Sequence, residues 1–162
     1  GGRAYCVKID IFNLYKSFNK IKKLKLNINQ VFYFASPMIR DSKNKKIDQK
    51  LLREYDAIYV KPIKNLVKNM INYFSKNFSI FYPSSIYADK IPFRLKEYAM
   101  SKIKAEKEIE ILNKHYKKQY IYFSRLPVLS TDQNPSISIN ENRKNIKFFV
   151  KEISKFSDKK FK

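Results

Sequence analysis

The sequence predicts an α/β fold in which a parallel sheet of about four strands carries helices on both faces. Short runs of apolar residues alternate along the chain with longer segments whose apolar residues recur at helical spacing. The short runs are apolar at nearly every position, which is typical of parallel strands that are buried on both faces. Strands and helices that alternate in this way are joined by right-handed crossovers into one sheet. The length of 162 residues predicts a single domain, residues 1–162.

The expected strands are short and rich in β-branched and aromatic residues. They cover residues 4–10, 31–34, 78–82 and 120–126. Cys6 lies in the first of them and is expected to be a small residue of the core. Ala35, Ser36 and Pro37 end the second strand. Small side chains at that position would let a ligand approach the carboxyl end of the sheet, although an ordinary turn explains them equally well.

The expected helices are amphipathic, with apolar residues on one face and lysines on the other. They cover residues 14–25, 48–77, 96–118 and 145–156. Pro62 lies inside the second helix and is expected to kink it, because proline lacks the N–H that a helix interior needs.

The formal net charge of +21 is compatible with nucleic-acid binding, since Lys and Arg displace the counterions of phosphates. However, only six of the 35 basic residues are Arg, the residue that makes bidentate contacts with bases. The chain is also rich in Ile, Asn, Tyr and Phe, and an A/T-rich genome yields such a composition without any polyanionic partner. Nucleic-acid binding therefore remains only a minor alternative.

The sequence holds no run of roughly 18 apolar residues, so no membrane-spanning segment is expected. It opens with no secretory signal pattern, and its one cysteine forms no intrachain disulfide, so we expect a cytoplasmic protein. A single His and a single Cys predict no transition-metal site.

Tyr98 and Lys102 lie four residues apart near the start of the third helix, on one face of it. A tyrosine hydroxyl titrates near pH 10, and a nearby ammonium group favours the phenolate and lowers the pKa of the tyrosine. Tyr98 could then exchange a proton with a substrate at neutral pH. A serine at the end of the preceding strand, Ser85 or Ser84, could hold the substrate oxygen. The alternative is an amphipathic helix with a stray aromatic residue.

Four segments carry a family resemblance: residues 82–89, 97–102, 124–133 and 31–37. Together they resemble the short-chain dehydrogenase/reductases, most of all the extended members and the ketoreductase-type and thioester-reductase-type domains. The resemblance implies a Rossmann-like doubly wound sheet and a reaction in which NAD or NADP exchanges a hydride with a carbonyl or alcohol. The substrate would be a small-molecule or acyl carbonyl compound.

The resemblance also implies roles for individual residues. Tyr98 would be the general acid/base. Lys102 would lower its pKa and hold the nicotinamide ribose, and Ser85 would hold the substrate oxygen, with Ser84 as the alternative. The implied cofactor-binding residues are Asp10 near the adenine, Ala35 and Ser36 beside the nicotinamide ribose, Lys102, and Thr131 at the carboxamide. For Asp10, a turn-starting residue that caps the following helix is at least as good an explanation.

The sequence departs from the family pattern at the phosphate-binding loop. Its only two glycines are Gly1 and Gly2, and a dinucleotide-binding loop needs glycines for its tight turn. The chain therefore resembles the C-terminal portion of a reductase domain without its first nucleotide-binding unit. Lys61 stands where the family has a proton-relay Asn, and Pro127 where it commonly has Gly. These departures leave two possibilities: a reductase that needs a complementing chain or a homo-oligomer over an uncovered sheet edge, or a non-catalytic module that acts in assembly or substrate positioning.

Overall fold

A parallel sheet forms the middle layer of the computed structural model, which describes residues 2–42, 45–74, 77–129 and 139–158. The sheet has the order β1-β2-β3, with β1 at Gln30–Phe32, β2 at Phe78–Ser85 and β3 at Gln119–Leu126. β2 pairs with β3 along its whole length, from Phe78 opposite Gln119 to Ser85 opposite Leu126. Since all three strands are parallel, their carboxyl ends meet at one edge of the sheet.

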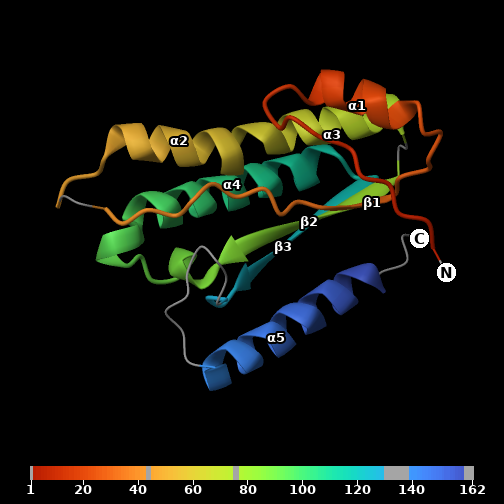
Figure 1. The fold of residues 1–162 in the computed structure, drawn as a ribbon. Helices are drawn as coiled ribbons and strands as arrows, with labels where there is room; N and C mark the ends of the chain where they lie inside the picture. The colour runs from red at the N-terminus through yellow and green to blue at the C-terminus, as the bar shows by residue number, and fades with distance from the viewer. Residues whose placement is uncertain (1, 43–44, 75–76, 130–138, 159–162) are drawn as a thin grey trace.

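Helices cover both faces of the sheet (Figure 1). On one face, α4 packs on β2 and β3, α2 packs on α4, and α1 packs on α3. The C-terminal helix α5 lies on the opposite face, against β3. The helices are α1 Leu14–Lys22, α2 Gln49–Tyr59, α3 Lys61–Tyr73, α4 Lys96–His115 and α5 Ile139–Ser157, with short 3-10 turns at Ile86–Ala88 and Phe93–Leu95. The predicted parallel sheet with helices on both faces is thus confirmed.

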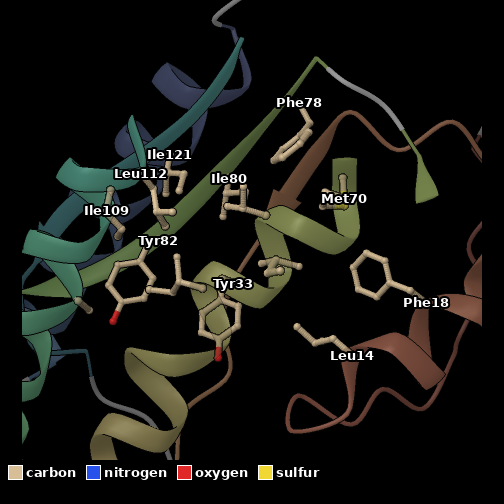
Figure 2. Close-up of a cluster of buried hydrophobic side chains, with 14 of the residues drawn as sticks. Leu14, Phe18, Tyr33, Met70, Phe78, Ile80, Tyr82, Ile109, Leu112 and Ile121 are labelled. Carbon is tan, nitrogen blue, oxygen red and sulfur yellow. The ribbon is translucent and has the colours of Figure 1, made fainter. Parts of the chain in front are cut away.

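The core lies mainly between β2 and the helices α3 and α4 (Figure 2). Alternate residues of β2, namely Phe78, Ile80 and Tyr82, point into this core, because successive strand side chains face opposite sides. Phe81 points the other way and packs against Phe156 of α5, with 5.6 Å between the ring centroids. Strand β2 is therefore buried on both faces, as its run of apolar residues predicts.

Pro62 divides the predicted helix of residues 48–77 into α2 and α3. A continuous helix would need an N–H from Pro62 to the carbonyl of Ile58, and proline has none. Instead, the hydroxyl of Tyr33 in the chain after β1 donates to the carbonyl of Ile58 at 2.6 Å. The hydroxyl of Tyr82 in β2 donates to the next carbonyl, that of Tyr59, at 3.3 Å. Two tyrosines, one just after β1 and one in β2, thus satisfy the carbonyls that the break leaves free.

The predicted strand of residues 4–10 is wrong. The structure has no regular element there, and Tyr5 and Ile9 are about half exposed. Cys6 is exposed rather than buried in the core. An extended segment becomes a strand only when a neighbouring strand takes up its backbone hydrogen bonds, and the described sheet ends at β1. The described part of the chain accordingly has three strands rather than about four. None of its helices is both long enough and apolar enough to cross a membrane.

Candidate active site

A pocket of about 300 Å³ lies at the carboxyl ends of the three strands. It brings together six of the predicted site residues: Ala35, Ser36, Ser84, Ser85, Tyr98 and Lys102. The first two follow β1, the two serines end β2, and the last two come from the first two turns of α4. Residues that are far apart in the sequence thus meet at the edge where open α/β sheets bind ligands.

A buried carboxylate at the start of α4 fixes the position of that helix. Glu97 is fully buried, accepts a hydrogen bond from the hydroxyl of Ser42, and accepts another from the backbone N–H of Asp48 at 2.9 Å. Burial by itself would raise the pKa of Glu97, but these hydrogen bonds outweigh it and hold the pKa below its usual value. The first turn of a helix also favours a negative charge. Glu97 therefore ties the segment before α2 to the turn that carries Tyr98.

Tyr98 lies with its ring against two tyrosines of α2. The ring centroids are 5.9 Å from that of Tyr55 and 5.6 Å from that of Tyr59, both edge to face. Burial raises the pKa of the Tyr98 phenol above its ordinary value, and a side-chain hydrogen bond with Ser85 acts in the opposite direction. Tyr98 and Ser85 line the same pocket, and the phenol is protonated at neutral pH.

Lys102 is buried, with 4% of its surface exposed. Its ammonium nitrogen donates to the backbone carbonyl of Pro83 at 2.7 Å and lies 3.9 Å from the ring centroid of Tyr59. Burial lowers the pKa of Lys102 to about 7, although the charge of Glu106 opposes this. The expectation that Lys102 lowers the pKa of Tyr98 is therefore not met in this arrangement. With a pKa of about 7 the amine is charged only in part of the molecules at neutral pH, which weakens its effect on the phenol.

The two serines at the end of β2 have different partners. The Ser84 hydroxyl donates to the carboxylate of Glu106 on α4. The Ser85 hydroxyl accepts from the backbone N–H of Tyr87 at 3.2 Å and interacts with Tyr98. The hydroxyl proton of Ser84 is thus already donated to a carboxylate, whereas that of Ser85 can still be donated to a ligand in the pocket. The geometry favours Ser85 over Ser84 as the group that would hold a substrate oxygen.

Glu106 is in turn held by Arg125 at the end of β3. The guanidinium donates from Nε to Oε1 at 3.0 Å and from Nη2 to Oε2 at 2.6 Å, and it also pairs with Asp89. Such a bidentate pair fixes both partners in one plane. It supports the wall of the pocket because Glu106 also holds Ser84.

Replacing Arg125 by Met should lower the free energy of unfolding by about 2 kcal/mol. Truncating one partner of a buried ion pair costs about 3–5 kcal/mol. The cost should be smaller here, because the guanidinium of Arg125 is partly exposed and water screens the pair. Urea denaturation at pH 7 measures the change. Arg94→Met is the matched control, because Arg94 pairs with Asp41 at an exposed site and its loss should cost well under about 1 kcal/mol. Equal losses in the two variants would contradict the role of the Glu106 pair.

Two of the predicted cofactor-binding residues, Asp10 and Thr131, are not among the described residues that line the pocket. Asp10 is exposed, does not line the pocket, and lies in the turn before α1. Its carboxylate accepts from the N–H of Phe12 at 2.9 Å, and its own N–H donates to Ser17 at 2.9 Å. Asp10 thus forms a turn, but the residue that caps α1 is Asn13, whose side chain accepts from the N–H of Lys16. The assignment of Asp10 to the adenine stays a prediction. Thr131 lies outside the described residues. Lys61 is exposed at the start of α3 and does not line the pocket.

Tyr59 and Tyr87 line the pocket but were not predicted. The Tyr59 hydroxyl lies 2.7 Å from the hydroxyl of Ser36, so it connects the end of α2 to the chain after β1. Tyr55 and Tyr59 are four residues apart and share a helix face, which was a usable signal. What the spacing did not reveal is that this face turns toward α4.

These elements and their order define the class of the fold, that of the short-chain dehydrogenases. No family model and no curated protein matches the sequence, whereas solved structures match the fold. A dehydrogenase/reductase from Sinorhizobium meliloti 1021 has a TM-score of 0.72 at 12% identity, over 90% of this chain and 59% of that one. A short-chain dehydrogenase from Burkholderia cenocepacia J2315, in complex with NADP, has a TM-score of 0.70 at 15% identity, over 85% of this chain and 59% of that one.

A third structure is the alcohol dehydrogenase of the archaeon Thermococcus sibiricus, complexed with 5-hydroxy-NADP. It has a TM-score of 0.65 at 11% identity, over 88% of this chain and 66% of that one. The chain thus spans about three fifths of the length of these dehydrogenases. Likeness at this level of identity establishes the fold, and the activity is a separate question.

Proposed function

We propose that this chain supplies the catalytic part of an NAD(P)-dependent short-chain reductase, which reduces a carbonyl group to an alcohol. The observation that carries the proposal is the meeting of Tyr98, Lys102 and Ser85 in one pocket at the carboxyl ends of parallel strands. Apolar side chains, including Phe34, Ile39 and Leu126, line the rest of this pocket. They favour a small carbonyl or acyl compound with an apolar body.

In this proposal Tyr98 acts as the acid. Its phenol is protonated at neutral pH, because burial raises its pKa. It can therefore donate a proton to the oxygen of a carbonyl group, which is the direction of reduction. The hydroxyl of Ser85 would hold the same oxygen by a hydrogen bond. The nicotinamide cofactor, when bound, supplies the hydride.

The residues present fit one end of such a cofactor. The pocket of about 300 Å³ is at the small end of ligand sites and suits a nicotinamide ring with a substrate rather than a whole dinucleotide. Ala35 and Ser36 line it after β1, with Ser36 exposed, and small side chains there leave room for a ribose. Between Arg3 and Lys162 the sequence has no glycine for a phosphate-binding loop.

We therefore propose that turnover requires a glycine-rich nucleotide-binding unit supplied by another segment or chain. The position of β1 supports this, since β1 pairs with β2 on one side and is the last strand of the described sheet on the other. A further strand could add to that edge by backbone hydrogen bonds. In this proposal the domain is the C-terminal portion of a Rossmann-like reductase. We also propose that it works in the cytoplasm, where a lone exposed thiol such as Cys6 stays reduced.

A non-catalytic module is the second candidate, and the lack of glycines favours it. In that case the pocket would serve to hold an acyl group or to stabilise an assembly. Cofactor binding separates the two candidates, because a module without hydride chemistry has no need of a nicotinamide.

The test is a titration with NADPH and, separately, with NADH, followed by the melting temperature and by calorimetry. We expect millimolar cofactor to raise the Tm of the chain, since a ligand that binds only the folded state stabilises it. Ser36→Trp should abolish the rise, because a large side chain would fill the space beside β1. Asp10→Ala, in the turn before α1, is the control and should leave the rise unchanged. Absence of any shift or heat at millimolar cofactor would eliminate the reductase proposal for this chain by itself.

A further inference from the structure

The helices α1 and α3 carry positive charge without any negative charge among it. They pack against each other on the side of the sheet opposite α5 (Figure 1). None of the 14 acidic residues of the sequence lies in residues 11–40 or 57–88, which include both helices. We call the exposed residues of the two helices and of the turn after α1 the α1–α3 surface. Its lysines are all exposed and are Lys16, Lys20, Lys22, Lys23, Lys25, Lys61, Lys64 and Lys68.

Lysines of the other helices have acidic partners. Lys104 of α4 pairs with Asp56 of α2 at 2.7 Å, and Lys155 of α5 pairs with Glu152 at 2.5 Å. Among the residues that the structure describes, no lysine of the α1–α3 surface forms an ion pair. An A/T-rich genome raises the lysine content of a whole chain, but it does not keep acidic residues away from one surface. Charges of one sign that lie together repel each other, and a bound polyanion would relieve this repulsion.

The lysines of α1 form a row on its exposed side. Lys16, Lys20 and the C-cap residue Lys23 are four and three residues apart, so they share one side of the helix. The apolar side of α1 is buried in the core together with residues of α3. An amphipathic helix that binds a membrane inserts its apolar side between the lipids, and α1 has no such side to spare. A polyanion in solution therefore fits this surface better than a membrane does.

Exposed aromatic rings accompany these lysines. Phe12, just before α1, is 69% exposed, and Tyr15 in its first turn is 66% exposed. The ring of Tyr15 meets that of Tyr73 of α3 edge to face, with 5.9 Å between the centroids. The ammonium group of Lys22 lies 5.8 Å from the same Tyr73 ring. Rings that stay in water contribute little to folding, whereas the unpaired bases of a single-stranded nucleic acid stack on such rings.

We propose that the α1–α3 surface binds single-stranded RNA or DNA. The lysines contact the phosphates, and Phe12 and Tyr15 stack on bases. Lysine acts on a phosphate as a point charge, and the sequence has only six Arg for bidentate contacts with bases, so the binding has no sequence preference. None of the lysines of this surface is among the residues that line the pocket. The binding is therefore independent of the proposed reductase activity, and either can fail without the other.

The experiment measures the fluorescence anisotropy of a labelled oligouridylate of about 20 nucleotides, titrated with the whole chain at 50 mM and at 200 mM KCl. If the five lysines in residues 14–25 each contact one phosphate, the affinity should be about 10²-fold weaker at the higher salt concentration, because each contact releases counterions from the strand. Tyr15→Ala should weaken binding at least ~5-fold at either concentration, since it removes a ring on which a base stacks.

A variant with Lys16→Gln, Lys20→Gln and Lys23→Gln tests the lysine row. Its affinity at 50 mM KCl should be at least ~10-fold lower. The slope of the logarithm of affinity against that of salt concentration should become shallower by about 2, because each lost phosphate contact removes about 0.7 from it. All three side chains are exposed, so the substitutions should not disturb the core.

The matched control replaces a row on α5, with Lys144→Gln, Lys147→Gln and Lys151→Gln. These lysines are also exposed, have the spacing of a helical row, and lie on the other side of the sheet. The control changes the net charge equally and should leave the affinity and the salt slope nearly unchanged. Equal losses in the two triple variants would mean that net charge alone attracts the strand, and would overturn the assignment to the α1–α3 surface.

Crosslinking of the unaltered chain to a 4-thiouridine oligonucleotide gives an answer that does not depend on how a variant folds. Peptide mass spectrometry should find the adducts at Phe12 and Tyr15. Adducts confined to other segments would overturn the proposal. So would the absence of oligonucleotide binding at 50 mM KCl, whether or not the chain binds vesicles of phosphatidylserine and phosphatidylcholine.

Discussion

Replacing Tyr98 by Phe is expected to lower the rate of NADPH-dependent carbonyl reduction by about 10²–10⁴-fold, the usual contribution of a positioned general acid. The substitution removes only the hydroxyl that would donate the proton in the proposed reaction. The ring, which packs against Tyr55 and Tyr59, stays in place. Cofactor affinity should change little. The measurement is NADPH absorbance with a panel of small aldehydes and ketones, using the assembly that binds the cofactor.

Tyr55→Phe is the matched control for this prediction. Tyr55 belongs to the same cluster of rings, but its hydroxyl accepts from the backbone N–H of Arg40 at 2.8 Å and does not line the pocket. This variant should retain its turnover. The rate of the unaltered protein should hold through neutral pH and fall only above pH 10, because the phenol of Tyr98 deprotonates above the ordinary pKa of tyrosine. A Tyr98→Phe variant with normal turnover would exclude Tyr98 as the acid.

Lys102→Met is expected to remove a pH dependence of stability. In the unfolded chain a lysine stays charged up to about pH 10.4, whereas burial lowers the pKa of folded Lys102 to about 7. Between these values the unfolded chain binds more protons, so the free energy of unfolding rises with pH. Below pH 7 Lys102 is protonated in both the folded and the unfolded chain, so the full free-energy cost of burying its charge lowers the stability. A shift of this size corresponds to a rise on the order of 4 kcal/mol between pH 6 and pH 10.

Urea denaturation at several values between pH 6 and pH 10 measures this dependence. The unaltered protein and a Lys104→Met control should both show the rise, while Lys102→Met should show a much flatter profile. Above pH 10 stability should fall again, because burial also raises the pKa of Tyr33, Tyr59 and Tyr82, and folding then opposes their ionisation. Parallel curves for the two methionine variants would show that Lys102 is charged in the folded protein and that its burial carries no such penalty.

Apolar pattern and spacing predicted much of the fold from the sequence. The runs at residues 78–82 and 120–126 become the paired strands β2 and β3, because a continuous apolar run is stable only when both of its faces are covered. Ser84 and Ser85 follow the first run, so they lie at the carboxyl end of β2, where the pocket is. Residues 4–10 have the composition of a strand as well, but composition does not supply a neighbouring strand, and the segment remains irregular.

The predicted residues that line the pocket are those that are close in the sequence or end a strand. Tyr98 and Lys102 share a helix face by spacing alone. Tyr59 was missed because its contribution depends on how α2 turns toward α4. Asp10 makes local hydrogen bonds with Phe12 and Ser17, and its place beside the adenine stays a prediction.

The amino-acid sequence by itself determined the alternation of strands and helices, the break at Pro62, and the placing of a tyrosine and a lysine on one face of a helix, because each of these depends on local geometry. Only the tertiary structure decided the protonation of that pair. Arg125 arrives from β3 and binds Glu106, and the described contacts of the Lys102 nitrogen are a carbonyl group and tyrosine rings. Its charge then depends on desolvation, which is a property of the packed environment and cannot be read from residue spacing.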